Sequence, residues 1–435
     1  MSKTTFKNEL VLFAVAILVA TTSFAQKKDS VPKHISSKID LIDTVSDPAL
    51  RLPKPYATKS VDNRSQVIGW KDGKMPIAPE GFVVSKFADG FENPRWIYIG
   101  PNGDVFVSEA ATRPNSANRV TLLRDENKDG TYETRETFLS QLNRPFGMLI
   151  MGNYFYVANT DGLLRFPYTA GQKAITAKGE KILELPAGGY NNHWTRNIIA
   201  SADGKKILVS VGSGSNVGEN GMDKEVRRAC ILVIDPDGKG EKMFASGLRN
   251  PVGMDFAPGT LSLWTAVNER DELGDDLVPD YITSVKEGGF YGWPYSYFGQ
   301  NEDPRLKGQR PDLVKQAIIP DIAVGSHTAS LGLAFYKAKA FPEKYRNGVF
   351  IAQHGSWNRS QLSGYKVLFV PFTNGKQSGK PEDFLTGFIA NEKESKVYGR
   401  PVCIAILPDG SMLVSDDASN TIWQIKPLKN NLKLN

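Results

Sequence analysis

The chain has 435 residues, 23% of them charged, and a formal net charge of +6 at neutral pH. Its basic residues are scattered and form no basic stripe, which argues against nucleic acid as a partner and leaves an anionic ligand possible. Two cysteines, Cys230 and Cys403, are too few for a disulfide framework. Both lie in apolar, strand-like runs, so we expect buried free thiols.

The N-terminus predicts export from the cell. An apolar run over residues 10–20 follows two lysines and ends in Ser23, Phe24 and Ala25. This is the pattern of a cleaved signal peptide over residues 1–25, and it predicts a periplasmic or secreted protein. An uncleaved anchor is the alternative, although the run is short for a bilayer span. No later segment is apolar enough to cross a membrane, so we expect no stable membrane insertion.

The next part of the chain divides into a lead-in, a repeat region and a short tail. Residues 26–75 are polar, contain several prolines and show no sustained period, which indicates a linker and extended lead-in. Over residues 76–427 a short strand, a turn and a second strand recur six times, and residues 428–435 form a C-terminal tail. The six hairpins are predicted over residues 96–109, 146–159, 197–211, 252–267, 332–353 and 402–416.

Arginines open five of these six hairpins. The first four are separated by 49, 52 and 53 residues and the fifth follows after 151, which leaves room for two longer units. A period of about 50 residues built from short strands, with no amphipathic helical pattern, predicts an all-β, six-bladed β-propeller. Two β-sandwiches are the alternative. The five residues are Arg95, Arg144, Arg196, Arg249 and Arg400.

In a propeller, the start of each hairpin lies at one end of the central channel. Five guanidinium groups at that mouth would repel one another unless a polyanion or several carboxylates offset their charge. The sequence therefore indicates a polycarboxylate ligand. The alternative is that each arginine caps a turn or pairs with a neighbouring carboxylate.

Histidine is scarce, and three of the four residues adjoin hairpins. His193 lies in the segment NNHWTR, while His327 and His354 flank the fifth hairpin; His34 lies in the lead-in. Imidazole titrates near neutral pH, so His193 is a candidate general base. A turn histidine bonded to backbone is the alternative. A zinc site is a third interpretation, although the spacing matches no usual ligand pattern.

Two acidic segments are candidate calcium sites, because hard cations prefer oxygen ligands. Residues 267–280, VNERDELGDDLVPD, form an acidic loop after the fourth hairpin. The second segment matches the spacing of a calcium loop, although its flanks predict strands and a plain hairpin turn is the alternative. Its residues are Asp125, Asn127, Asp129, Gly130 and Glu136. No CxxCH motif or Rossmann fingerprint occurs, which argues against an attached haem and a nicotinamide cofactor.

These motifs together resemble the soluble PQQ-dependent sugar dehydrogenases, in particular the sorbosone dehydrogenase branch. The resemblance covers residues 78–426 and rests on NNHWTR, GLRNPVGMDF, EGGFYGWP after the acidic loop, QHGSWNRS and GRPVCIAILPDG. It implies a six-bladed propeller that holds pyrroloquinoline quinone (PQQ) and calcium at the channel mouth. The implied substrate is a sugar or polyol, and a separate cytochrome or quinone would accept the electrons.

The resemblance also implies roles for individual residues. His193 matches the catalytic base, Arg249 the arginine that polarises the quinone, and Asn250 the neighbouring cofactor contact. Asp275 matches the calcium-binding carboxylate, joined by the backbone carbonyls of Glu269 and Arg270. The remaining residues expected to contact the cofactor are Arg196, Arg359, Tyr398 and Arg400.

Three departures from the family pattern leave alternatives open. No Asp follows the histidine hairpin at residues 211–216, so Ser213 or another loop must hold His193. Tyr398 stands where the family has a second C-terminal arginine, and Glu269 and Arg270 replace a Gly-Pro pair. The missing Asp leaves open a carbohydrate-binding propeller without activity. A calcium-dependent lactonase is the other alternative function, and it would need acidic metal ligands but no arginine ring.

Overall fold

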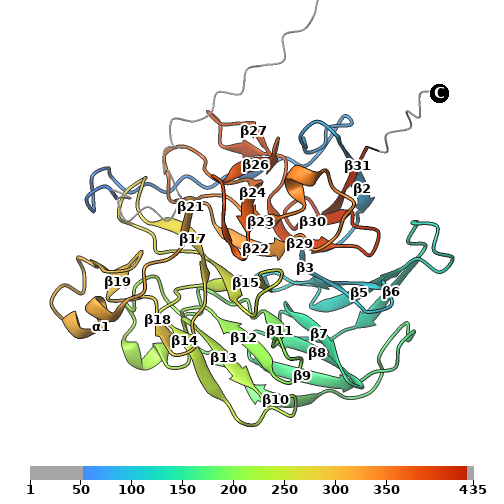
Figure 1. Ribbon diagram of the computed structural model, residues 1–435, viewed down its shortest axis with the longest axis horizontal. Helices are drawn as coiled ribbons and strands as arrows, with labels where there is room; N and C mark the ends of the chain where they lie inside the picture. The colour runs from blue at the N-terminus through green and yellow to red at the C-terminus, as the bar shows by residue number, and fades with distance from the viewer. Residues whose placement is uncertain (1–51, 429–435) are drawn as a thin grey trace, which may run out of the picture. The chain divides into compact units, whose positions relative to one another are not determined.

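The computed structural model describes residues 52–428, which form a six-bladed β-propeller (Figure 1). The predicted signal peptide, residues 1–25, and residues 429–435 of the tail lie outside the described residues. Between residues 52 and 428, the helices are α1 (Pro311–Gln316) and two short 3-10 helices, η1 (Met222–Glu225) and η2 (Glu343–Tyr345). No helix in this range has the length and apolar character of a membrane span.

The first four strands of each of the first three blades form an antiparallel sheet. All three contain a predicted hairpin as their first two strands. Blade 1 contains β3 (Pro94–Ile99), β4 (Val105–Glu109), β5 (Arg119–Arg124) and β6 (Thr134–Leu139). Blade 2 contains β7 (Met148–Met151), β8 (Tyr154–Asn159), β9 (Gly162–Pro167) and β10 (Glu180–Glu184). Blade 3 contains β11 (Ile198–Ala200), β12 (Ile207–Val211), β13 (Cys230–Ile234), β14 (Lys242–Ser246) and, parallel to β14, β18 (Gly289–Phe290).

The other three predicted hairpins are also present. Blade 4 contains β15 (Pro251–Phe256), β16 (Leu263–Val267), β17 (Pro279–Ser284) and β21 (Ile322–Ser326). Blade 5 contains β22 (Ser330–Phe335), β23 (Gly348–Gln353), β24 (Lys366–Thr373), β25 (Lys376–Gln377) and β26 (Glu382–Leu385). Blade 6 contains β29 (Pro401–Ile406), β30 (Met412–Asp416), β31 (Thr421–Pro427) and, from the start of the chain, β2 (Phe82–Ala88).

The innermost strands form a closed cycle. Contacts run from β3 to β7, β11, β15, β22 and β29 in turn, and β29 contacts β3 again. The ring is fastened in blade 6, where β2 pairs with β31 in an antiparallel register that sets Phe82 opposite Pro427. A cavity of about 580 Å³ is lined by residues from all six inner strands, among them Tyr98, Leu149, Ala200, Asp255, Phe335 and Ile406. The fold class predicted from the hairpin repeat is confirmed.

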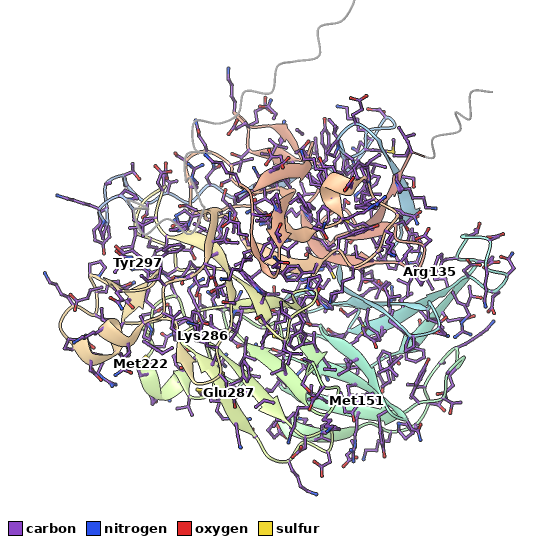
Figure 2. All side chains as sticks on the ribbon, in the orientation of Figure 1. Arg135, Met151, Met222, Lys286, Glu287 and Tyr297 are labelled. Carbon is purple, nitrogen blue, oxygen red and sulfur yellow. The ribbon has the colours of Figure 1, made fainter. Side chains whose placement is uncertain are left out.

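Apolar faces of adjacent blades form the core, and side chains fill the spaces between the ribbons (Figure 2). Between blades 1 and 2, the rings of Phe106, Phe138 and Phe155 lie 4.7–5.0 Å apart at tilted or edge-on angles. Each such pair contributes about 0.5–1.5 kcal/mol beyond its buried area. Cys230 and Cys403 are buried, unpaired thiols, as expected.

The described part of the lead-in, residues 52–75, lies along the loops at one end of the channel. Its strand β1 (Gln66–Val67) pairs with β28 (Lys396–Val397), which pairs with β27 (Ile389–Asn391). Asn63 donates through its backbone to the carbonyl of Trp357, and Trp70 donates to the Asp416 carboxylate over 2.8 Å. A further small hairpin, β19 (Ser296–Tyr297) and β20 (Asn301–Glu302), lies in the long connection before α1.

Candidate active site at the channel mouth

The predicted chemistry gathers at the end of the channel where the inner strands begin. Two kinds of segment supply it: the residues just before each inner strand, and the loops after each second strand, which return to the same end. The segments before inner strands provide His193, Arg249, His327 and Arg400, and the loops after second strands provide Ser213, Glu269, Asp271, His354 and Asp417.

His193 is held in one tautomer by the turn after β12. Its Nδ1 lies 3.0 Å from the Ser213 carbonyl oxygen and 2.9 Å from Ser213 Oγ. The Ser213 hydroxyl donates its own hydrogen to the Ser215 carbonyl over 2.6 Å, so both neighbours of Nδ1 are acceptors. Nδ1 therefore carries the proton, and Nε2 keeps a lone pair. Ser213 thus contacts His193 at the point where the resemblance implies an Asp.

The environment of His193 keeps its ring neutral. Burial, followed by the nearby positive charge of Arg249, lowers the pKa of His193 well below its usual 6.5. The only side-chain neighbour of Nε2 among the described residues is Asn192, whose amide nitrogen lies 3.4 Å away. A neutral imidazole with an accessible lone pair is the form that a general base requires.

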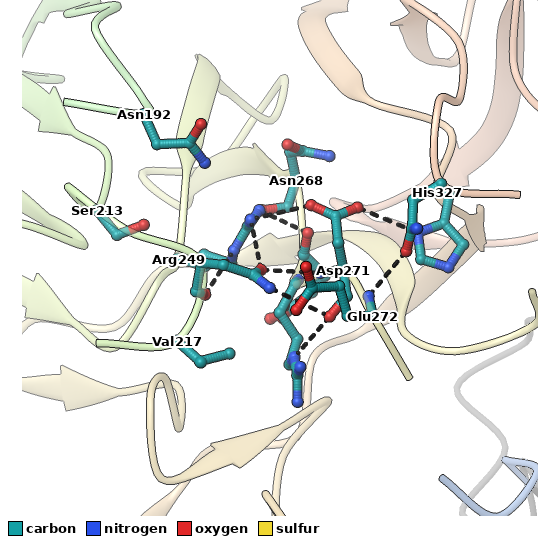
Figure 3. Close-up of polar contacts among 12 residues, drawn as sticks. Asn192, Ser213, Val217, Arg249, Asn268, Asp271, Glu272 and His327 are labelled. Atoms are coloured by element: carbon teal, nitrogen blue, oxygen red, sulfur yellow. Dashed lines mark hydrogen bonds and ion pairs between the residues drawn. The ribbon is translucent and has the colours of Figure 1, made fainter. Parts of the chain in front are cut away.

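Arg249 is buried and fully engaged by the protein (Figure 3). It donates to the carbonyls of Asn216, Asn268 and Glu269, over 3.1, 3.2 and 2.6 Å. Its Nη2 donates to Asn216 Oδ1 over 2.9 Å and pairs with the Asp271 carboxylate over 3.2 Å. These five contacts fix the orientation of the guanidinium, which leaves it no unused N–H for another partner.

Asp271 joins Arg249 to His327, as the dashed contacts in Figure 3 show. Burial opposes ionisation of Asp271, but the contact with His327 and the charge of Arg249 outweigh it and lower its pKa. Both ring nitrogens of His327 face acceptors, Asp271 Oδ1 at 3.3 Å and the Gly274 carbonyl at 2.9 Å. Burial opposes a charge on His327 too, yet these two acceptors raise its pKa. Asp271 therefore lies between Arg249 and His327, and both favour its ionised form.

A second charged cluster lies between blades 1, 5 and 6. Asp417 pairs with Arg95 Nη1 over 2.5 Å and with His354 Nε2 over 2.8 Å. Arg400 donates to the carbonyls of His354 and Gly355, over 2.8 Å in each case. Burial, followed by the charge of Arg400, lowers the pKa of His354 to about 4, so its ring is neutral. The Arg95 guanidinium lies 5.3 Å from the ring of Trp194, beside His193.

Several buried polar atoms at the mouth lack a protein partner within residues 52–428. They are Arg95 Nε, Asn250 Oδ1 and Glu269 Oε1, and Arg400 Nη1 also has no protein acceptor there. Burial raises the pKa of Glu269 to about 7. Unpartnered guanidinium, amide and carboxyl atoms of this kind are suited to contacts with a polar ligand. Arg400 has a donor left for a carboxylate.

Two arginines of the predicted ring, Arg196 and Arg144, contact backbone carbonyls, as the turn-capping alternative expects. Arg196 is fully buried and donates to the carbonyls of Pro186, His193 and Thr195. Arg144 is half-buried, with a 3.4 Å contact to the Thr112 carbonyl.

Two of the predicted cofactor residues contact neighbouring loops. Arg359 donates to the Asp275 carbonyl and pairs with Asp276 over 2.9 Å. Tyr398 stacks on Trp70 at 4.9 Å, and its hydroxyl accepts a hydrogen bond from Lys74 over 2.6 Å.

The predicted calcium ligands of the acidic loop each contact a different part of the protein. The Asp275 carboxylate accepts the Ser360 N–H over 3.0 Å and contacts the Ser360 hydroxyl. The Glu269 carbonyl accepts a hydrogen bond from Arg249, and the Arg270 side chain pairs with Asp303 over 2.7 Å. A shared ion at these residues stays a prediction.

The second calcium loop needs a correction. Carboxylate oxygens of Asp125, Asp129 and Glu133 lie within 4.8 Å of one another, and Asn127 donates to Asp129 over 3.0 Å. Glu136 is not in this cluster. It lies in β6 opposite Leu122, because the chain leaves the loop as a strand rather than as the helix that the motif assumes.

Sequence reasoning missed Asp417 as the partner of Arg95 and His354, whereas Ser213 was among the groups expected to hold His193. Asp417 directly follows the second strand of the sixth hairpin, and Ser213 and His354 stand at similar points of their blades. The ends of the second strands were therefore an available signal, since they return to the same mouth as the hairpin starts. The three histidines His193, His327 and His354 make separate contacts, so the structure gives no support to a shared zinc site.

Comparison with known proteins places this geometry in context. The profile of the TrAA12-like family matches residues 76–284 and 310–428. An uncharacterized protein of Borreliella burgdorferi is 31% identical over 359 residues, which is 80% of this chain and 89% of that protein. A pyrroloquinoline quinone-dependent pyranose dehydrogenase of Coprinopsis cinerea is 24% identical over 420 residues. That match covers 81% of this chain but only 54% of the dehydrogenase, so the chain spans about half its length.

Solved structures share the fold at low sequence identity. The PQQ domain of the C. cinerea pyranose dehydrogenase superposes with a TM-score of 0.68 at 20% identity, covering 82% of this chain and 98% of that domain. The soluble aldose sugar dehydrogenase of Escherichia coli superposes with a TM-score of 0.59 at 15% identity, covering 80% of this chain and 99% of the other. At these identities the likeness establishes the propeller fold alone.

Proposed function

The chain belongs to the TrAA12-like family, and from this premise we propose that it is an oxidoreductase that oxidises a sugar or related polyol with PQQ. The relatives that have a named activity are dehydrogenases of pyranoses or aldoses. The observation that carries the proposal is the neutral His193, with its Nε2 lone pair at the channel mouth beside a fixed guanidinium. The substrate class is an aldose or a sorbosone-like sugar, acting through a CH–OH or hydrated aldehyde group.

The chain's own residues would supply proton transfer and charge. PQQ, when bound, supplies a two-electron acceptor for hydride from the carbon that bears the hydroxyl. His193 Nε2 takes the hydroxyl proton, while Ser213 holds the Nδ1 proton in place. The Arg249 guanidinium, fixed by its contacts with carbonyls and Asp271, offers a positive charge that does not have to reorganise.

We assign cofactor binding to the groups whose polar atoms have no protein partner among the described residues. Arg400 and Arg95 would face carboxylates, and Asn250 and Glu269 would complete the polar contacts. A calcium ion, if the relatives' pattern holds, would draw on Asp275 and the carbonyls of Glu269 and Arg270. Electrons would leave to a separate acceptor, and the predicted signal peptide would place the reaction in the periplasm or outside the cell.

The experiment is reconstitution with PQQ and calcium, followed by dye reduction with a panel of aldoses and polyols. We expect an altered PQQ absorption spectrum and sugar-dependent turnover. His193→Ala should retain the bound chromophore and lose turnover. Arg400→Gln should weaken PQQ binding, whereas Arg135→Gln, at an exposed position on β6, should not (Figure 2).

Two outcomes would reject the proposal. The absence of both a spectral change and turnover would favour a binding propeller without activity. Lactone hydrolysis without PQQ would favour the lactonase alternative. Normal turnover in His193→Ala would reject the role of His193 alone. A calcium requirement that Asp275→Ala leaves unchanged would reject the assignment of Asp275 as a calcium ligand.

A further inference from the structure

A buried carboxylate lies behind the turn that holds His193. Glu225, the last residue of η1, has 6% of its surface exposed. One of its oxygens accepts the Gly214 N–H over 2.7 Å, and the other contacts the Ser215 hydroxyl. The charge of Arg228 interacts with this carboxylate, but no ion pair forms between them in the described part of the chain. Both carboxylate oxygens bond to the turn at residues 213–215.

The turn at residues 213–215 determines the position of His193. Ser213 and Ser215 are both completely buried. The Ser213 hydroxyl donates to the Ser215 carbonyl, and the same hydroxyl oxygen lies 2.9 Å from His193 Nδ1. Ser215 Oγ also accepts the Gly218 N–H over 3.0 Å, which leaves Glu225 as the acceptor for the Ser215 proton. The contacts therefore run from Glu225 through Ser215 and Ser213 to His193.

We propose that Glu225 is a positioning residue, which fixes His193 as the Nδ1–H tautomer by ordering the Ser213–Ser215 turn. Its meaning for catalysis rests on the proposed function, but the tautomer itself is a property of the free protein. Glu225 would then do, through two serines, what the resemblance led us to expect from a directly bonded Asp. A carboxylate suits this task because its two oxygens accept from two donors, Gly214 and Ser215, at once.

A glutamine cannot reproduce this arrangement. Gly214 and Ser215 donate to different oxygens of Glu225, and a glutamine has an oxygen at only one of these two positions. Its amide hydrogens would face the other donor. In Glu225→Gln the Ser215 hydroxyl must therefore turn, which alters the carbonyl and hydroxyl that flank His193 Nδ1. Glu219 offers a matched control in the same loop. Its carboxylate accepts the N–H groups of Asn216 and Val217, and among the described residues it has no hydrogen bond to the turn at residues 213–215 or to His193.

The test is nitrogen-15 NMR of imidazole in the protein without PQQ. The chain has four histidines, so the His193 resonances can be assigned with a His193→Gln variant. We expect a single Nδ1–H tautomer in the wild type and in Glu219→Gln, and a mixture or the Nε2–H form in Glu225→Gln. If Glu225→Gln leaves the tautomer unchanged, the proposal is overturned. Should Glu225→Gln fail to fold, Ser215→Ala removes the same link and must give the same mixture.

Kinetics of the PQQ-loaded enzyme add a second readout. Glu225→Gln should lower kcat about tenfold or more with little change in PQQ affinity, because the nitrogen that must accept a proton already carries one. In a Ser213→Ala background the same change should have almost no further effect. Full additivity of the two changes would overturn the route through Ser213. An absence of any turnover in the wild type would reject the proposed function while leaving the NMR result intact.

Discussion

His354 makes the fold sensitive to acid in a way that can be calculated. Its pKa is lowered to about 4, first by burial and then by the charge of Arg400, while an exposed histidine titrates near 6.5. Between these values the unfolded chain binds a proton that the folded protein excludes. Stability contributed by the neutral ring is therefore complete above pH 6.5 and falls as the pH drops toward 4.

The size of the effect follows from the shift. The fall of the His354 pKa from 6.5 to about 4 corresponds to a full cost of about 3 kcal/mol below pH 4. At pH 5 the unfolded chain is almost fully protonated at this site and the folded one is not, so the cost is about 2 kcal/mol. Because the His354 side chain is only 14% exposed, solvent screening does not reduce this figure appreciably.

The assay is urea unfolding at pH 7 and pH 5 of the wild type and His354→Gln. The glutamine amide can still donate to Asp417 but does not titrate. The wild type should lose about 2 kcal/mol more than the variant between the two pH values. Some loss remains in the variant, because the pKa of His193 is also lowered. Equal losses in the two proteins would refute the reasoning.

His327 supplies a control of opposite sign. Its pKa is raised by Asp271 and the Gly274 carbonyl, in spite of burial, so its contribution to stability is complete in acid and is lost as the pH rises through its folded-state pKa. His327→Gln should therefore lose more stability than the wild type between pH 7 and pH 5.

Three further predictions concern the base and its surroundings. Gly212→Ala should lower the free energy of unfolding by about 1–3 kcal/mol and much reduce kcat, because the added methyl would lie 2.6 Å from His193 Cβ and 2.3 Å from Asn250 Oδ1. Gly188→Ala, where the added methyl has no neighbour within 4 Å, is the control. Equal effects of the two changes on thermal unfolding and turnover would contradict the steric argument. Asp271→Asn removes a negative charge that raises the pKa of His193, so the acid limb of the kcat/KM profile should move to lower pH, and an upward move would contradict it. The calcium affinity of the free protein, measured by calorimetry, should be the same in the wild type and in Glu136→Gln, since Glu136 is outside the 125–133 cluster. A lower affinity in the variant would restore the original ligand set.

The six hairpins were predictable because their signals are local. Each inner hairpin combines apolar strands with a turn rich in Gly, Pro, Asp or Asn, and neither depends on distant residues. His193 and its contact with Ser213 were also within reach, because Ser213 ends the second strand of the hairpin that His193 opens.

The charge pairing at the mouth could not be predicted in the same way. Arg95 and Asp417 are 322 residues apart in sequence, and they meet only because blades 1 and 6 are neighbours in the ring. Tyr398 illustrates a different limit: matching it to a family arginine gave no hint that the lead-in residue Trp70 stacks on it. Likewise, the spacing of the calcium motif could not tell that a strand begins at Thr134 and removes Glu136 from the loop.

The pairing of β2 with β31 makes closure of the ring a late event in synthesis. The ribosome releases β2 more than 300 residues before β31, so β2 has no partner until almost the whole chain has been made. Asp417, which pairs with Arg95 of the first blade, is also made late. A chain that ends before Asp417 therefore lacks one wall of the mouth, and a ligand that contacts both walls would distinguish such a truncated chain from the 435-residue one.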